Sequence, residues 1–549
     1  MKLLKPYKKN ILICMICIIL ELIMELLLPL ILSNTINVGI LNNDTSYIIR
    51  NIIIMVSILI IGLIGSILST YIASIISSNI SYELRSKIIN KVLKIKYQDI
   101  NTINIGHTVT LVTNDIVNIE NIIFLIIKIL VKVPLIIIGS ILLCLTISIK
   151  MSSILLIIIP VIIIISIIFI KKTYPYFNLT SISLDNINSN VRENITNVKL
   201  VKSEVKEQYE MNKFDKNNME YKKIDTKALK TISLMMPLIM FIINITIILI
   251  LLFSKYNNIK IGNVTAFIEY INLLLVSIVS TSMIFLLTIQ SSVSIKRIKE
   301  LLMLEEEQLS TGITKKIDGS IEFKNVYFSY NKKYNLENIN FKIKKGEKVA
   351  IIGTSGSGKT TLINLIKENY KITKGEILID DINIDKYDSK YLKEQILIVN
   401  QKANLFKNTI NNNLRFNKHI DIKSYIDLTL SNKIIQNKKV VEQNGKNLSG
   451  GEKQRLVLAR TLIQEPSVLI LDDSLSALDL KTEEKIINNL LNKYQDKTII
   501  FITSRIKSIK NFNKIILLDN GRIQDIGNHQ ELLQNPIYKE LCSMGSDIS

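Results

Sequence analysis

The chain has 549 residues, which is too long for one ordinary domain and suits two or three. Its residues are 48% hydrophobic and 21% charged, which argues against one soluble domain and against a bare membrane bundle, so we expect a membrane domain joined to a water-soluble one. A net charge of +21 could indicate binding to nucleic acid, but lysines that face an anionic membrane leaflet produce the same total. We therefore expect no nucleic-acid partner.

Six apolar stretches in the first 300 residues are long enough to cross about 30 Å of hydrocarbon. They are residues 11–32, 52–76, 122–147, 154–170, 234–253 and 264–289. Lysines precede the first stretch and are frequent in the second-to-third and fourth-to-fifth connections, whereas the connection at 33–50 has almost no positive charge. The positive-inside rule therefore predicts a multi-pass protein of the cell (plasma or inner) membrane, with the N-terminus and everything after Lys296 in the cytosol.

The two long lysine-rich connections have helical apolar spacing over residues 80–96 and 186–230. We therefore expect the membrane helices to continue into the cytosol, with short helices at their tips near residues 97–112 and 188–194. Such tips are placed to contact a partner domain.

Four ionisable residues lie inside the apolar stretches. Glu21 and Glu25 share one face of the first span, and they predict either contact with a cationic substrate or proton, or a polar face satisfied by neighbouring helices. Lys128 and Lys132 open the third span, and we expect them to extend toward the cytosolic surface.

A change in composition near residue 302 divides the chain. We expect a membrane domain at 1–302, a linker at 303–316 and a second domain at 317–549. In the second domain short apolar runs alternate with helical patterns, which is typical of an α/β domain with a largely parallel sheet. The expected strands include 321–323, 348–352, 396–399, 468–471 and 498–503.

A glycine-rich loop follows the second of these strands and opens a helix. It comprises Gly353, Thr354, Ser355, Gly356, Ser357, Gly358, Lys359 and Thr360, with Thr361 next in the helix. Glycines let backbone N–H groups converge on phosphate oxygens, and a helix N-terminus adds partial positive charge. The motif predicts a phosphate loop in which Lys359 reaches the β- and γ-phosphates and the Thr360 hydroxyl binds Mg²⁺.

The strand at 468–471 ends in the carboxylates Asp472 and Asp473. A carboxylate at the end of a buried strand downstream of a phosphate loop predicts an Mg²⁺ ligand, and we assign that role to Asp472.

The segment Leu448-Ser-Gly-Gly-Glu-Lys-Gln454 resembles the signature sequence of ATP-binding cassette (ABC) proteins. Other segments resemble that family in chain order, and the resemblance covers nearly the whole chain. It implies an all-α membrane domain of six helices followed by an α/β nucleotide-binding domain, the architecture of an ABC exporter half-transporter that uses ATP and Mg²⁺.

The resemblance also implies roles for single residues. Tyr330 resembles the aromatic residue that stacks on adenine, and Gln401 the glutamine that binds the metal and links nucleotide state to the membrane domain. Residues 476–479, ending in Asp479, resemble the loop that crosses the dimer interface. Two cassettes are implied to meet head to tail, so that a second chain's ATP is contacted by Ser449, Gly450, Gly451 and Gln454.

Two positions depart from the family pattern. Asp473 stands where the family has a catalytic Glu, and loss of one methylene withdraws the carboxylate by roughly 1.5 Å. Ser504 stands where the family has a His that faces the γ-phosphate, and serine offers no ring N–H. Together they predict a site that binds ATP but hydrolyses it weakly, as in the degenerate subunit of heterodimeric multidrug-type exporters.

We therefore expect a similar, non-identical second half-transporter as the partner. The alternatives are a homodimeric exporter with slow turnover, an ATP-gated channel or regulator, and a soluble cassette ATPase that acts on nucleic acid or ribosomes. The cargo is expected among small molecules, drugs, lipids and peptides.

Overall fold

The computed structural model describes residues 2–100, 105–257, 259–331, 333–416, 420–503, 505–510 and 512–544. The chain divides into two compact units. A helical unit contains residues 1–95 and 102–305, and an α/β unit contains residues 96–101 and 306–549.

The helical unit is built from long helices that carry the six predicted spans. They are α1 (Lys8–Asn34), α2 (Thr45–Lys94), α5 (Ile116–Ile147), α6 (Ile149–Thr196), α8 (Glu207–Ser233) with α9 (Met235–Tyr256), and α10 (Ile261–Met303). A short 3-10 helix η1 (Lys2–Tyr7) precedes α1, and π-helical turns η2 (Thr35–Ile40) and η3 (Leu111–Asp115) follow α1 and precede α5. The prediction of six spanning helices is confirmed.

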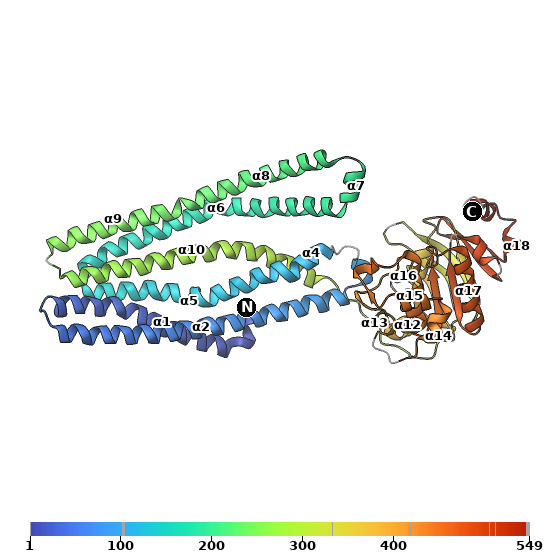
Figure 1. Ribbon diagram of the computed structural model, residues 1–549, viewed down its shortest axis with the longest axis horizontal. Helices are drawn as coiled ribbons and strands as arrows, with labels where there is room; N and C mark the ends of the chain where they lie inside the picture. The colour runs from blue at the N-terminus through green and yellow to red at the C-terminus, as the bar shows by residue number, and fades with distance from the viewer. Residues whose placement is uncertain are drawn as a thin grey trace. The chain divides into compact units, whose positions relative to one another are not determined.

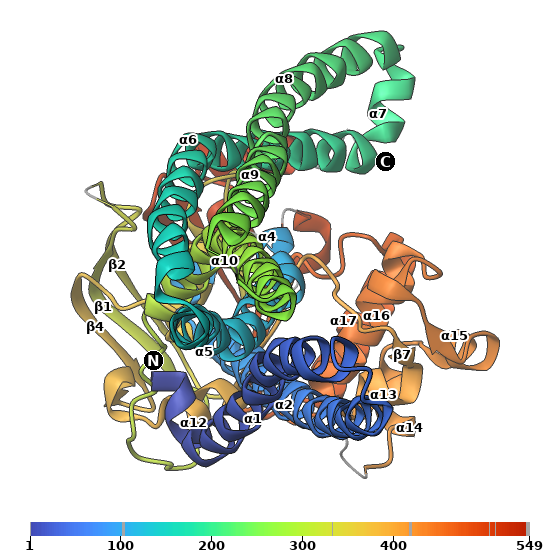
Figure 2. The ribbon, with the colours of Figure 1, turned by 90° about the vertical axis from the view of Figure 1, so that its left-hand side faces the viewer.

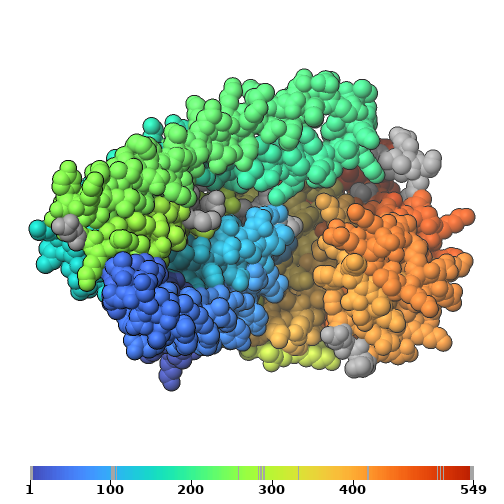
Figure 3. Space-filling view, turned by 60° about the vertical axis from the view of Figure 1, so that its left-hand side comes forward, coloured from blue at the N-terminus to red at the C-terminus, as the bar shows by residue number. Residues whose placement is uncertain are grey.

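The helices α2 and α6 run far beyond their apolar stretches, as predicted. After α2 come α3 (Tyr97–Ile100) and α4 (Ile105–Thr110), which are short helices at the expected tip. The prediction of a second tip at residues 188–194 is wrong. That segment contains no Gly or Pro that would end a helix, and it continues as part of α6. The chain turns instead at α7 (Val198–Ser203), which joins α6 to α8 in a hairpin (Figure 1). The space-filling view shows α8 and α9 as one continuous green band (Figure 3).

The α/β unit is centred on a six-stranded sheet in the order β12-β11-β3-β10-β9-β6. Its strands are β3 (Lys348–Ile352), β6 (Ile396–Val399), β9 (Val468–Asp472), β10 (Thr498–Ile502), β11 (Lys514–Asp519) and β12 (Arg522–Gly527). All neighbours pair in parallel except β11 and β12. Alternate side chains of β3 enter two different cores, Ala350 and Ile352 on one face and Val349 and Ile351 on the other.

A second sheet in the order β2-β1-β4-β5 is antiparallel. Its strands are β1 (Ile321–Phe328), β2 (Leu336–Ile343), β4 (Lys374–Ile379) and β5 (Ile382–Asn383). The predicted strand 321–323 therefore exists but belongs to this sheet and not to the parallel one. Figure 2 shows β1, β2 and β4 together at one side of the unit and α13–α15 with β7 at the other.

Short helices and one small strand pair complete the α/β unit. They are α11 (Lys359–Ile366), η4 (Ile384–Lys386), α12 (Ser389–Gln395), β7 (Asn408–Thr409), α13 (Ile410–Arg415), α14 (Lys423–Leu428), α15 (Asn432–Asn437), β8 (Val440–Val441), η5 (Gln443–Gly445), α16 (Gly450–Leu462), α17 (Leu480–Lys493), η6 (Ile506–Ile509), α18 (His529–Leu532) and α19 (Pro536–Met544).

An ion-pair network connects three of the spanning helices. Lys132 of α5 donates to Glu21 Oε1 (2.8 Å) and Glu25 Oε1 (2.7 Å) of α1. Lys128 donates to Ser69 Oγ (3.1 Å) and Thr70 Oγ1 (2.7 Å) of α2. The lysines thus point toward neighbouring helices and not toward the cytosolic surface, because ionised groups among apolar side chains are stabilised by opposite charges and hydroxyls. This arrangement supports the polar face satisfied by neighbouring helices.

We predict that Lys132→Met destabilises the protein strongly. The substitution leaves the buried Glu21 and the partly exposed Glu25 without this cation. Removing one member of a fully buried pair costs about 3–5 kcal/mol, so we expect a loss of about 2–3 kcal/mol for this partly buried network. The matched control is Lys87→Met, which removes an exposed pair with Glu83 on α2 at 3.8 Å and costs less than about 1 kcal/mol. Thermal unfolding of both purified variants in one detergent measures the difference. Equal small shifts of Tm would contradict the network.

Candidate nucleotide site

The glycine-rich loop connects β3 to α11, as the sequence predicts. Gly356 and Gly358 have φ of +83° and +106°, a region that other residues rarely adopt. At Gly353 there is no room for a side chain, because a Cβ would lie 1.9 Å from the carbonyl oxygen of Leu518. The loop therefore requires glycine for its close approach to β11 and for its turn into the helix.

The loop folds back around the ammonium group of Lys359. Lys359 Nζ donates to the carbonyl oxygens of Gly353 (2.8 Å) and Thr354 (2.7 Å) and to Ser357 Oγ (3.3 Å). Burial lowers the pKa of Lys359, and the nearby carboxylates of Asp472 and Asp473 oppose that shift. The ammonium is thus held in the loop at the position where phosphate oxygens need a cation.

Two carboxylates face this lysine from the end of β9. Burial raises the pKa of Asp472, and the adjacent Asp473 raises it further against the opposing effect of Lys359. Burial also raises the pKa of Asp473, against a hydrogen bond from Gln401 and the charges of Arg505 and Lys359. Gln401 Nε2 donates to Asp473 Oδ2 at 3.0 Å, so the loop after β6 contacts the end of β9.

A cavity of about 430 Å³ lies between the loop and these carboxylates. Its lining consists of Gly353, Ser355, Gly356, Ser357, Gly358, Lys359, Thr360, Thr361, Gln401, Asp472, Asp473, Ile502 and Thr503. The sequence analysis predicted all of these residues as parts of the nucleotide site except Ile502 and Thr503. A carboxylate, a hydroxyl and an amide oxygen in one cavity form a donor set that suits Mg²⁺, so Asp472, Thr360 and Gln401 fit a magnesium ion.

Tyr330 lies beside the start of α11. Its hydroxyl group donates to Thr361 Oγ1 at 3.3 Å, and the side chain of Tyr370 meets its ring edge-on at 5.0 Å between centroids. Tyr330 is 44% exposed, so its ring is available to a planar ligand. The Thr354 side chain is directed elsewhere, because its hydroxyl donates to Asp519 Oδ1 at 2.8 Å.

The signature segment begins α16. Ser449 is the N-cap of that helix, and its hydroxyl oxygen accepts from the N–H of Glu452 at 3.2 Å in a capping box. Gln454 is buried, and its Oε1 accepts from the N–H of Ala477 at 3.0 Å. Among the described residues, the side chain of Gln454 thus contacts the chain's own 474–479 segment.

The predicted site residues form two separate groups within this chain. Ser449, Gly450, Gly451, Gln454 and Asp479 are absent from the described lining of the phosphate-loop cavity. Asp479 is the N-cap of α17 and accepts from the N–H of Thr482 at 3.0 Å, and hydrogen bonds from Thr482 lower the pKa of Asp479. Ser504 lies outside the described residues.

The sequence analysis missed four residues of this region. Ile502 and Thr503 line the cavity, and Tyr370 packs against Tyr330. Arg505 donates to backbone carbonyl groups near Asp473. The position of Thr503 at the end of a parallel strand was a usable signal, whereas the contacts of Tyr370 and Arg505 arise only from the folded chain.

Comparisons with known proteins agree with a membrane domain followed by a nucleotide-binding domain. The family model described as "ABC transporter transmembrane region" matches residues 11–279, and the model described as "ABC transporter" matches residues 336–476. The ABC transporter ATP-binding protein YfiB of Bacillus subtilis (strain 168) is 30% identical over 98% of this chain and 96% of its own length. The ATP-dependent lipid A-core flippase of Haemophilus influenzae (strain 86-028NP) is 41% identical over 41% of each chain.

A solved structure supports the fold. A bacterial Atm1-family ABC exporter with ATP bound superimposes with a TM-score of 0.85 and 19% identity, covering 98% of this chain and 99% of that chain.

The fold and the site define a phosphate-loop ATPase domain attached to six membrane-spanning helices. The chain belongs to the ABC transporter family. It is a multi-pass membrane protein with its nucleotide-binding domain in the cytosol, and its ATPase domain places it among ATP-driven transporters.

We predict that Lys359→Met lowers the affinity for ATP about 10- to 100-fold, because a hydrogen bond to a charged group contributes about 1.5–3 kcal/mol. The control is Lys348→Met at the start of β3, where Nζ donates to the carbonyl oxygens of Gly346 and Lys497. That control should lower Tm and leave the affinity unchanged. Binding of a fluorescent ATP analogue, measured beside thermal unfolding, separates the two effects, and equal losses of affinity would refute the assigned role.

Proposed function

We propose that this chain is one half of a heterodimeric ABC exporter and that its own phosphate loop forms an ATP site with weak hydrolysis. A second, similar chain supplies the more active site. The single observation that carries the proposal is the chemistry around Asp473, the residue that follows the proposed metal ligand.

Asp473 is poorly suited to activate water. Its carboxylate sits one methylene closer to the backbone than that of a glutamate would, a withdrawal of roughly 1.5 Å. A misplacement of about 1 Å costs about 10²-fold in rate. One carboxylate oxygen also accepts a hydrogen bond from Gln401 Nε2 at 3.0 Å, so this oxygen is already bound to a side chain of the same protein.

The residue at 504 adds a second deficit. Serine there offers the γ-phosphate no imidazole N–H and no share of positive charge, both of which histidine would supply. The shorter carboxylate at 473 and the missing imidazole at 504 together favour a site that retains ATP without cleaving it.

The signature segment supports a partner chain. Ser449, Gly450 and Gly451 are intact at the N-terminus of α16, where backbone N–H groups favour an anion, yet they do not line the described cavity of their own phosphate loop. They are proposed to contact ATP held by the second chain. The spanning helices also leave surface for lipid and a partner, since 11% to 44% of each apolar window is buried in the single chain.

Magnesium is proposed to accompany the nucleotide. Asp472, Thr360 and Gln401 would hold it, and the ion would supply positive charge to the phosphates. The chain's own groups orient the nucleotide: Tyr330 contacts adenine, and Lys359 and the loop N–H groups bind phosphate oxygens.

The cargo is proposed to be a small molecule, drug, lipid or peptide. One relative is an ATP-dependent lipid A-core flippase, which favours a lipid or another amphipathic molecule as the cargo. A homodimer with slow turnover and an ATP-gated channel are the competing functions. Flux into sealed vesicles against a gradient separates an exporter from a channel, because only the exporter accumulates cargo.

We predict that Asp473→Glu combined with Ser504→His raises ATP turnover of the purified full-length chain about 10- to 100-fold. The physical reason is the restored reach of the carboxylate and the added N–H donor. Phosphate release at saturating ATP measures the change, and Asp473→Asn is the control that should leave the slow turnover nearly unchanged. Brisk turnover of the wild-type chain without a partner, abolished by Asp473→Asn, would contradict the proposal.

A further inference from the structure

Residues 474–479 connect Asp473 to α17 and lie against the start of α16. The N–H of Ala477 donates to Gln454 Oε1 at 3.0 Å. A Cβ at Gly451 would lie 3.2 Å from the carbonyl oxygen of Ala477, so the two backbones are in close contact. One side of this segment is therefore attached to the helix that begins with the signature.

Arg505 attaches the other side. Its guanidinium group donates to the carbonyl oxygens of Ser476 (2.6 Å) and Leu478 (3.1 Å). Two bonds from one rigid planar group to carbonyls two residues apart fix both the position and the orientation of the segment.

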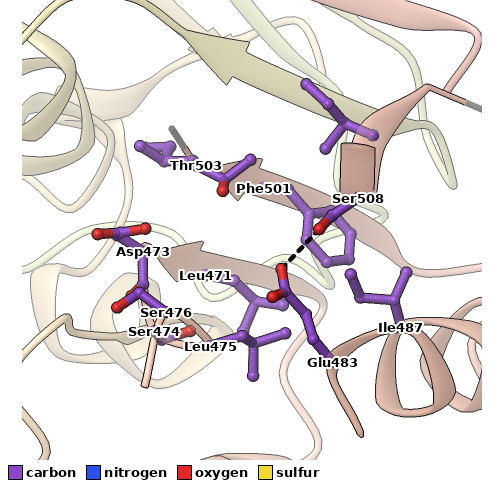
Figure 4. Close-up of a pocket in the computed structure, with 12 residues that line it drawn as sticks. Leu471, Asp473, Ser474, Leu475, Ser476, Glu483, Ile487, Phe501, Thr503 and Ser508 are labelled. Carbon is purple, nitrogen blue, oxygen red and sulfur yellow. Dashed lines mark hydrogen bonds between the residues drawn. The ribbon is translucent and has the colours of Figure 1, made fainter. Parts of the chain in front are cut away.

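Glu483 fixes Arg505 in turn. Its side chain is 4% exposed, and Oε2 accepts from Arg505 at 2.6 Å. Its Oε1 accepts from Ser508 Oγ at 2.7 Å, and Figure 4 shows Glu483 and Ser508 pointing toward each other from α17 and η6. A buried carboxylate is costly unless it is paired, so Arg505 and Glu483 hold each other in place.

The neighbouring cavity is too small for a ligand. It holds about 20 Å³ and is lined by Asp473, Ser476, Glu483 and Thr503, among others (Figure 4). That volume accommodates about one water molecule. The space beside the charged cluster therefore has no room for a substrate.

The backbone connects this cluster to Asp473. The carbonyl oxygen of Asp473 accepts from Ser476 Oγ at 2.8 Å, and the N–H of Asp473 donates to the carbonyl oxygen of Ile502 at 2.8 Å. Asp473 has a φ of +45°, a conformation that persists only where the surroundings impose it. Ser476 is thus bonded directly to the backbone of Asp473.

We propose that Arg505, held by Glu483, is a positioning residue that sets residues 474–479 and thereby couples Asp473 to the signature end of α16 in the same chain. The geometry of this chain's phosphate-loop site and the geometry of the signature that it offers to a second chain then change together. The inference rests on the ATPase reaction and holds for a homodimer or a heterodimer.

The test compares variants of the full-length transporter in its native assembly. Arg505→Met is expected to lower kcat at least about 10-fold and to change the affinity for ATP by less than about 2-fold, since Tyr330 and Lys359 remain in place. Arg505→Lys should retain part of kcat, because an ammonium donates to one carbonyl. The isosteric Glu483→Gln should lower kcat less than Arg505→Met. Arg522→Met on β12 is the control, since it removes an exposed pair with Glu337.

A charge exchange, Glu483→Arg with Arg505→Glu, distinguishes positioning from simple stabilisation. The exchanged pair can restore Tm, but a glutamate at 505 cannot donate to the carbonyl oxygens of Ser476 and Leu478, so kcat should stay low. Recovery of kcat together with Tm, or an unchanged kcat in folded Arg505→Met and Glu483→Gln, would overturn the inference. Neither outcome depends on the ATPase rate of the wild-type chain without a partner. That rate tests the proposed heterodimer separately.

Discussion

The side-by-side, parallel order of β3, β10 and β9 is the constraint on which the nucleotide site depends. Carboxyl ends of parallel neighbours meet at one edge of a sheet, so the loop after β3, the carboxylates after β9 and the segment after β10 converge there. A phosphate loop alone would leave Lys359 without Asp472 opposite it. One cavity at this edge therefore contains a lysine for the phosphates. It also contains carboxylates for a divalent ion.

The residues of this chain that are assigned to nucleotide binding form two separate groups. The phosphate loop and its carboxylates line one cavity, whereas Ser449 and the following glycines lie at the N-terminus of α16, outside its described lining. The segment 474–479 connects the two groups within one chain. Under the proposed function, a second chain closes each ATP site, and a weak site on this chain is compatible with an intact signature that serves the partner.

Much of this organisation could be predicted from the sequence, because local chemistry determines it. Glycines at 356 and 358 are required by positive φ, and the spans are required by the thickness of the membrane. Contacts between distant segments could not be predicted. The approach of Lys132 to Glu21, the turn at α7 and the bonds of Arg505 depend on which helices and strands become neighbours, and the antiparallel sheet has no signal that distinguishes 321–323 from a parallel strand.

The most direct measurement uses an ATP analogue with a photoreactive group on its γ-phosphate, bound to the assembled full-length transporter. Isotopic labelling of one chain identifies, by mass spectrometry, the chain from which each cross-linked peptide comes. The account predicts that nucleotide bound by residues 353–361 of one chain becomes linked to a Ser-Gly-Gly peptide of the other chain. Cross-links confined to the phosphate loop and Ser449 of the same chain would contradict it.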